Sequence, residues 1–263
     1  TLIGVSKSEA DVLPDGALLP GALTEVTLPA SLKAIGDGAL ASTAIKEILI
    51  PATVEKIGVS AFANCNSLES VAFPASVKAL GVNAFADCGA LKLADISAAA
   101  LEDVPAGAFA RCAALAEASL PSVAEIGASA FAGCKALTAV EFPKSLKKID
   151  ERAFYGSGLA AADLAPCPTL GEIGAWSFAA CGDLASATFP ESLKELGIGA
   201  FYSSSALTLG ELPPVARLSD LSLAAIGGTA DASLTRPEAV EIGVSGMAGW
   251  QGSQLRALAE TTG

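Results

Sequence analysis

The residues best suited to chemistry in this chain are its six cysteines, and five of them recur at one fixed place. Each of these five follows a phenylalanine by three residues: Cys65, Cys88, Cys112, Cys134 and Cys181. Hydroxyl residues take the same place in other copies: Thr43, Ser157 and Ser204. Exchange between small, weakly hydrogen-bonding groups predicts structural side chains packed near the backbone. Disulfides in an oxidising compartment and metal binding are the alternatives, although ligands spaced one per copy do not converge on a tetrahedral site.

Cys167 is the one cysteine outside this pattern. It lies between Pro166 and Pro168 in a segment that is longer than its counterparts. Insertions on a repeating scaffold belong to surface loops, so Cys167 is predicted to be the most accessible thiol. The alternative is an inert loop residue.

The chain contains no histidine. This excludes Ser-His-Asp and Cys-His nucleophile activation and zinc motifs of the H-E-x-x-H type. A hydrolase that uses only carboxylates stays open, but it needs two carboxyl groups facing each other across a cleft at about 5–9.5 Å. Gly243, Gly246 and Gly249 do not match a G-x-G-x-x-G nucleotide motif. We therefore predict no enzymatic activity, no cofactor and no metal.

The charge balance limits the kinds of partner that the chain can bind. The chain has 28 acidic and 16 basic residues, a net charge of −12. Nucleic acids and anionic membranes repel such a chain, whereas a basic or cation-bridged partner would be attracted. No uncharged apolar run reaches the roughly 18–20 residues of a membrane helix, so no membrane insertion is expected. The sequence starts at Thr1 without a signal-peptide pattern, which suggests a mature or trimmed fragment.

Phenylalanine returns every 22 to 24 residues, and this period predicts the architecture. Leucine or methionine continues the series at both ends. The full series is Leu18, Leu40, Phe62, Phe85, Phe109, Phe131, Phe154, Phe178, Phe201, Leu223 and Met247. Such a period predicts one α/β repeat solenoid of about ten coils over residues 1–263. Residues 1–22 would form a degenerate N-terminal cap, 23–207 the regular repeats, and 208–263 degenerate C-terminal repeats or a cap.

Each repeat reads as three short legs joined by corners. The first leg alternates like a half-buried strand, with Ile48 and Ile50 inward and Leu49 outward, and proline ends it. The second leg is short and is followed by a recurrent glycine, replaced once by Asp150, for which we expect a positive φ. The third leg carries Ala61, Phe62, Cys65 and Leu68 at a spacing that predicts a helical or 3₁₀ turn.

The repeat unit L-x-x-[VI]-x-[LIF]-P-x-x-[VL]-x-x-[IL]-G-x-x-A-F-x-x-C closely resembles the BspA-like, or treponemal-type, bacterial leucine-rich repeats of the leucine-rich repeat 5 family. The resemblance covers Leu23 to Leu207. It implies a curved, right-handed leucine-rich-repeat array with parallel β-strands. It also implies a secreted or cell-surface bacterial protein linked to adhesion, coaggregation and host recognition.

The outward positions of the first leg form a stripe that becomes acidic and hydroxylic toward the C-terminus. Solenoids commonly bind partners on such a surface, so we predict a partner-binding stripe; a solvated face without a ligand is the alternative. Four aromatic residues flank the third leg and are predicted to pack beside the phenylalanines, or, if exposed, to anchor a partner: Tyr155, Trp176, Tyr202 and Trp250. The stripe of predicted binding residues is Asp95, Ser119, Glu141, Asp163, Thr188 and Glu211.

The leading expectation is an extracellular, non-enzymatic module that binds a protein or glycan, with host extracellular matrix as a candidate. The alternative is a structural spacer or envelope component that presents another domain. The sequence leaves the ligand and the oligomeric state open.

Overall fold

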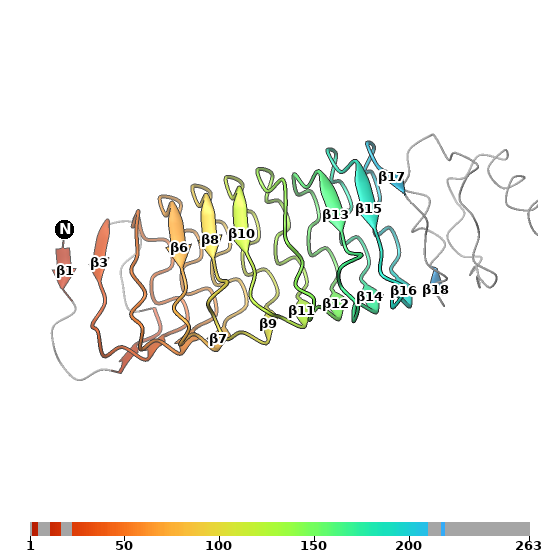
Figure 1. The fold of residues 1–263 in the computed structure, drawn as a ribbon. Coiled ribbons are helices and arrows are strands. Elements are labelled where there is room, and N and C mark those ends of the chain that lie inside the picture. Colours follow the sequence, from red (N-terminus) through yellow and green to blue (C-terminus); the bar gives the residue numbers. More distant parts are fainter. Residues whose placement is uncertain (1, 5–10, 17–22, 210–216, 219–263) are drawn as a thin grey trace, which may run out of the picture.

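The computed structural model describes residues 2–4, 11–16, 23–209 and 217–218, and it shows an elongated stack of coils (Figure 1). Eight coils are described, one around Leu40 and one around each of the seven phenylalanines of the series. The predicted number was about ten, because Leu18, Leu223 and Met247 were counted; these three residues lie outside the described part. The prediction of a parallel-strand solenoid is confirmed.

The first legs supply one row of parallel strands. They form a pair β1-β3 and two three-stranded sheets, β6-β8-β10 and β13-β15-β17. Segments 47–49 and 139–141, which were expected to be strands, are not, although Leu49 still points outward with 84% exposure and Ile50 is buried. The strands are β1 (Leu2–Gly4), β3 (Glu25–Thr27), β6 (Ser70–Ala72), β8 (Leu93–Asp95), β10 (Glu117–Ser119), β13 (Ala161–Asp163), β15 (Ser186–Thr188) and β17 (Thr208–Leu209).

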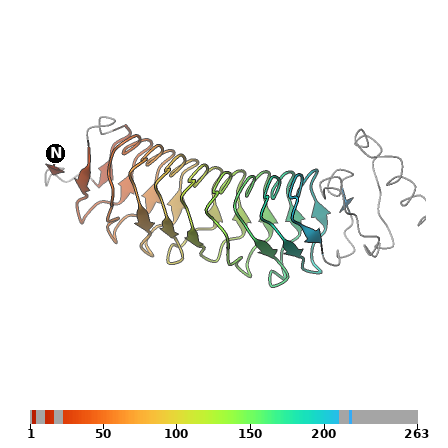
Figure 2. The same ribbon diagram turned by 90° about the horizontal axis from the view of Figure 1, so that it is seen from above.

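The second legs supply a separate row of two-residue strands along the other edge of the stack (Figures 1 and 2). They form the sheets β2-β4-β5-β7 and β9-β11-β12-β14-β16-β18, both parallel. These strands are β2 (Val12–Leu13), β4 (Ala34–Ile35), β5 (Lys56–Ile57), β7 (Ala79–Leu80), β9 (Asp103–Val104), β11 (Glu125–Ile126), β12 (Lys148–Ile149), β14 (Glu172–Ile173), β16 (Glu195–Leu196) and β18 (Arg217–Leu218).

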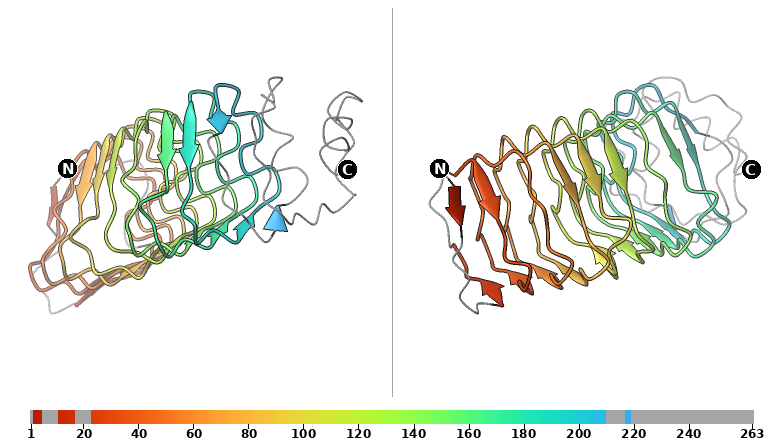
Figure 3. Two further views of the ribbon diagram at one scale, coloured as in Figure 1. Left: turned by 45° about the vertical axis from the view of Figure 1, so that its right-hand side comes forward. Right: turned by 60° about the vertical axis from the view of Figure 1, so that its left-hand side comes forward.

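The third legs contain no helix in the described residues, so the predicted helical or 3₁₀ turn is wrong. The reason is that every second N–H group bonds to the next coil, which prevents a continuous helical ladder. Phe62 N donates to Ala84 O at 2.7 Å and Asn64 N to Ala86 O at 2.8 Å, whereas Ala63 N and Cys65 N donate within their own coil. Residues two before and two after each phenylalanine have positive φ, for example Ser60 at 53° and Asn64 at 60°. This alternation turns every second N–H group toward the neighbouring coil, and the repeated loops lie side by side (Figure 3).

The phenylalanine rings form one continuous stack through the core. Neighbouring rings lie 4.7 to 5.6 Å apart at interplanar angles of 5–11°. All seven are fully buried, and burial of each side chain contributes about 1.5–3 kcal/mol before conformational entropy is subtracted. The coils therefore share a common interior, as the period predicts.

The corner glycines after the second leg have a different role from the one predicted. None of those described has a positive φ, and neither does Asp150. Instead, a Cβ on Gly81 would lie 2.3 Å from Gly58 C and Val59 N of the preceding coil. Glycine is needed here because two backbones approach closely. The described glycines at this corner are Gly36, Gly58, Gly81, Gly127, Gly174 and Gly197; Gly243 lies outside the described residues.

Candidate functional site

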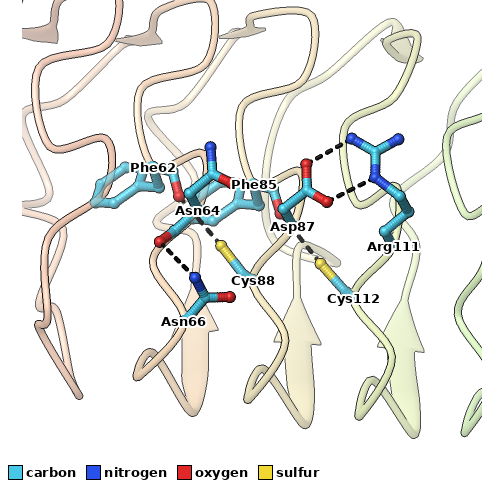
Figure 4. A network of polar contacts seen from close by, with 8 residues as sticks. All are labelled: Phe62, Asn64, Asn66, Phe85, Asp87, Cys88, Arg111 and Cys112. Carbon is cyan, nitrogen blue, oxygen red and sulfur yellow. Dashed lines mark hydrogen bonds and ion pairs between the residues drawn. The ribbon is translucent and has the colours of Figure 1, made fainter.

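The recurring cysteines form a ladder of buried thiols, each tied to the coil before it. The Cys88 thiol donates to Phe62 O at 3.1 Å, and the Cys112 thiol donates to Phe85 O at 3.1 Å (Figure 4). The Ser204 hydroxyl makes the equivalent bond to Phe178 O at 2.8 Å. The exchange of thiol for hydroxyl therefore has a physical basis, because both groups donate to the same carbonyl. The prediction of structural side chains packed near the backbone is confirmed.

The chemistry of these thiols is that of buried, protonated groups. All six cysteines are free and buried. Burial raises the pKa of Cys134 to about 12 and raises the pKa of Cys181 above its ordinary value. Because the thiolate is the nucleophile and the metal ligand, such thiols are poorly suited to either role.

Cys167 is fully buried, so the prediction that it is the most accessible thiol is wrong. Its insertion folds inward: Cys167 N bonds to Leu164 O at 3.0 Å, and Leu170 N bonds to Cys167 O at 3.1 Å. The two prolines beside it are exposed instead, while burial raises the pKa of the Cys167 thiol. The extra residues therefore place the two prolines at the surface and the sulfur of Cys167 in the core.

A second ladder, made of hydroxyl groups, was missed by the sequence analysis. At the corner after the first leg, Ser76 Oγ donates to Val54 O at 2.7 Å and Ser145 Oγ to Val123 O at 2.8 Å. Thr53, Thr169 and Ser192 make the corresponding bonds. The signal was present in the sequence, because serine or threonine recurs just before the apolar residue that opens the second leg.

The predicted partner-binding stripe lies along the first-leg face, in two registered segments. Asp95 of β8 is opposite Ser119 of β10, and Asp163 of β13 is opposite Thr188 of β15. Glu141 lies between these segments, where no strand is formed. Asp95 is half-buried, and the other four are exposed. The sixth member, Glu211, lies outside the described residues.

Two of the stripe carboxylates already have partners within the chain. Asp163 Oδ1 accepts a hydrogen bond from Thr188 Oγ1 at 2.5 Å, and Asp95 Oδ1 accepts bonds from the backbone and hydroxyl of Ser97 at 3.1 and 2.7 Å. These contacts hold the carboxylates in fixed positions. Glu141 remains exposed to solvent beside them.

The other outward position of the first leg adds to the acidic character of this face. Glu25, Glu47 and Glu117 are exposed there, whereas Leu93 and Leu49 supply apolar side chains. Lysines are few on this side, and Lys92 is paired with Glu69 at 2.9 Å. The first-leg face is therefore a rigid, acidic surface with isolated apolar side chains. We call this surface, from β3 to β15, the acidic face.

The second-leg edge has charges of both signs, many of which pair between coils. Lys78 Nζ lies 3.0 Å from Glu55 Oε2, and Lys148 Nζ lies 3.3 Å from Glu172 Oε1. Pairs with such exposed side chains contribute little to stability, typically about 0–1 kcal/mol.

The aromatic residues beside the third leg are less buried than expected. Tyr155 and Tyr202 are 41% and 45% exposed, so the prediction that they pack beside the phenylalanines is wrong. They follow the core phenylalanine by one residue, where most coils have a small alanine. Trp176 is half-buried and packs edge-on against Tyr202 at 5.2 Å. Trp250 lies outside the described residues.

No group of three or more histidine, cysteine, aspartate or glutamate side chains in the described part of the chain is placed to hold a metal ion. Within those same ranges, no helix is long and apolar enough to cross a bilayer.

Comparison with known proteins identifies relatives with the same architecture. A family model described as the BspA-type leucine-rich repeat region, in six copies, matches residues 20–116 and 102–220. A leucine-rich repeat protein from Bacteroides ovatus superposes with a TM-score of 0.69 at 25% identity, over 88% of this chain and 65% of that one. The chain thus spans just under two thirds of the length of that relative.

A leucine-rich cell surface protein from Faecalibacterium prausnitzii superposes with a TM-score of 0.50 at 23% identity, over 83% of this chain and 73% of that one. At this identity the likeness concerns the fold alone. No curated protein matches the chain in sequence.

Proposed function

Because the chain belongs to the family of BspA-type leucine-rich repeat proteins, we propose that it is a non-enzymatic binding module of a secreted or cell-surface bacterial protein. The Faecalibacterium prausnitzii relative is a leucine-rich cell surface protein, which supports this location. Adhesion to a host protein or glycan, with the extracellular matrix as the candidate source, is the activity we infer.

The observation that carries the proposal is the acidic face. Its parallel strands hold outward side chains in register between neighbouring coils, and Ser119, Glu141, Asp163 and Thr188 are exposed on it. A surface that is already rigid loses little conformational entropy when a partner binds. Its negative charge would speed the approach of a basic partner and make binding sensitive to salt.

The chemistry of the described residues also favours binding over catalysis. The thiols are buried, the chain has no histidine, and the carboxylates Asp95 and Asp163 already accept hydrogen bonds from neighbouring side chains. A structural role as a spacer remains the second candidate. The continuous ring stack and the shared core, which run the length of the described coils, favour it because they make the array stiff.

The proposal is tested by measuring binding of the purified chain to a panel of matrix proteins and to a glycan array at low and high salt. We expect binding to at least one basic matrix protein, weakening at least tenfold between about 50 and 500 mM NaCl. Absence of binding to every probe would favour the spacer.

Paired variants then locate the surface. Glu141→Lys with Asp163→Lys reverses two charges on the acidic face, and Asp103→Lys with Glu195→Lys reverses two exposed charges on the second-leg edge. Both variants change the net charge equally. The first should lose binding, and the second should retain it. Equal loss in both would show that only overall charge matters, and no loss in the first would exclude the acidic face.

A further inference from the structure

We infer that the solenoid contains a flexible joint between the coils of Phe85 and Phe109, held closed by the Asp87–Arg111 ion pair. At this junction the second-leg sheet is interrupted, because β7 pairs with β5 and β9 pairs with β11, but β7 and β9 do not pair with each other. Figure 1 shows β7 and β9 as successive strands along this edge.

Pro105 removes one of the backbone bonds that would cross the junction. It stands at the corner position where most other coils have glycine, whose N–H donates to the preceding coil: Gly127 N to Val104 O at 2.7 Å, and Gly174 N to Ile149 O at 2.7 Å. Proline has no N–H, so it cannot make the equivalent bond to Leu80. Leu80 is half-buried, whereas Ile57, its registered partner in β5, is fully buried.

The missing N–H, and not the presence of a side chain, distinguishes this corner. Asp150 also carries a Cβ at the corner position, yet Asp150 N donates to Ile126 O at 2.9 Å, and β11 pairs with β12. The insertion at residues 97–100 lengthens the same coil.

On the third-leg side of the junction, an ion pair joins the two coils. Arg111 Nε donates to Asp87 Oδ1 at 2.6 Å, and its terminal nitrogen lies 2.5 Å from Asp87 Oδ2 (Figure 4). Both residues hold positive φ two positions after their phenylalanines. Among the third legs that the structure describes, this is the one ion pair that joins two coils directly. It forms where the opposite edge is unpaired.

The first-leg strands stay paired across the junction, with Ala72 of β6 opposite Asp95 of β8. Bending would therefore turn about β6 and β8 and open the second-leg edge. Such a motion would change the angle between the two parts of the acidic face on either side of these strands. The joint gives the array a way to adjust its curvature.

Amide hydrogen exchange, measured residue by residue on the whole chain, tests the joint. The amides of Asn83, Phe85 and Asp87 donate across it, and those of Trp176, Phe178 and Ala180 make the same bonds at a junction where both rows of strands pair. We expect protection factors at least threefold lower for the first set. Arg111→Ala should lower them by about a further threefold, and 1 M NaCl should act in the same direction.

Pro105→Ala supplies the opposite test, because it restores an N–H while keeping a Cβ. It should raise the protection of Asn83, Phe85 and Asp87 at least threefold. Lys78→Ala is the matched control: it removes an exposed ion pair at the preceding junction, where β5 and β7 pair, and should leave the Phe62 amide unchanged. Equal protection of the two sets in the wild type, or no gain with Pro105→Ala, would overturn the inference.

Discussion

The thiol of Cys88 donates a hydrogen bond of 3.1 Å to the backbone carbonyl of Phe62, which also accepts the amide of Cys65 at 3.2 Å. One carbonyl oxygen thus uses both lone pairs, one within its own coil and one toward the next. This relationship recurs along the ladder and explains why a small donor is required three residues after each core ring.

The effect of a substitution at Cys88 on the free energy of unfolding should therefore depend on whether the new side chain can donate a hydrogen bond, more than on the loss of sulfur. Cys88→Ser keeps a donor and should change the free energy of unfolding by less than about 1 kcal/mol, as serine already serves at position 204. Cys88→Ala leaves one lone pair of a buried carbonyl without its donor and removes a packed atom, which should cost about 1–3 kcal/mol. Urea unfolding measures both; equal costs would contradict the hydrogen-bond account.

Stability should fall at alkaline pH, and the contribution of Cys134 to this loss can be measured. Burial raises its pKa to about 12 in the folded state, against about 8.5 for a thiol in the unfolded chain. The unfolded chain therefore loses its proton first. This contribution to stability is fully present below about pH 8.5 and is lost as the pH rises toward about 12.

Within that window Cys134 should reduce the free energy of unfolding by about 1.4 kcal/mol for each pH unit. Cys134→Ser removes the titrating group and keeps a donor. Urea unfolding at pH 8 and pH 10 should show a smaller loss of stability for this variant than for the wild type. An identical pH dependence in the two proteins would mean that the thiol is not protected in the folded state.

The buried hydroxyl of Ser177 has no hydrogen-bond partner, and it is the one such side-chain oxygen in the described ranges. Every other coil in those ranges has alanine at this place before the core residue. Ser177→Ala should raise the free energy of unfolding by about 1 kcal/mol, because a desolvated, unsatisfied polar group is removed. Thermal unfolding provides the measurement, and a lower melting temperature would indicate that the hydroxyl has a partner.

Close contact between coils predicts that alanine substitution affects stability differently at two glycines. A Cβ at Gly81 would lie 2.3 Å from backbone atoms of the preceding coil, whereas a Cβ at Gly182 would meet nothing within 4 Å. Gly81→Ala should destabilise the protein by about 1–3 kcal/mol through overpacking. Gly182→Ala should change stability little. Similar effects at both positions would show that the coils can separate at this corner without cost.

The sequence was sufficient for the parts of the fold that depend on the repeat. The ring stack, the thiol ladder and the proline corners follow from side chains that recur at a fixed place. The corner glycines were recognised but explained wrongly. Both a close approach to the neighbouring coil and a positive φ require glycine, so the sequence alone does not distinguish the two causes. At Cys167 the insertion folds back into the core through local turns, Cys167 N to Leu164 O and Leu170 N to Cys167 O, whereas length variation alone predicts a surface loop.

The acidic face was located by alternation along the first leg, but its division into two segments was not foreseen. Glu141 belongs to the same alternating pattern as Asp163, yet its leg forms no strand. Whether a short leg completes its hydrogen-bond ladder depends on both neighbouring coils.

The most direct test of the proposed function is an amide-exchange footprint of the chain bound to a matrix protein found in the binding panel. The account predicts slower exchange in β8, β10, β13 and β15 on the acidic face, with β9, β11, β14 and β16 unchanged. Protection confined to the second-leg strands or to the third-leg edge would contradict it.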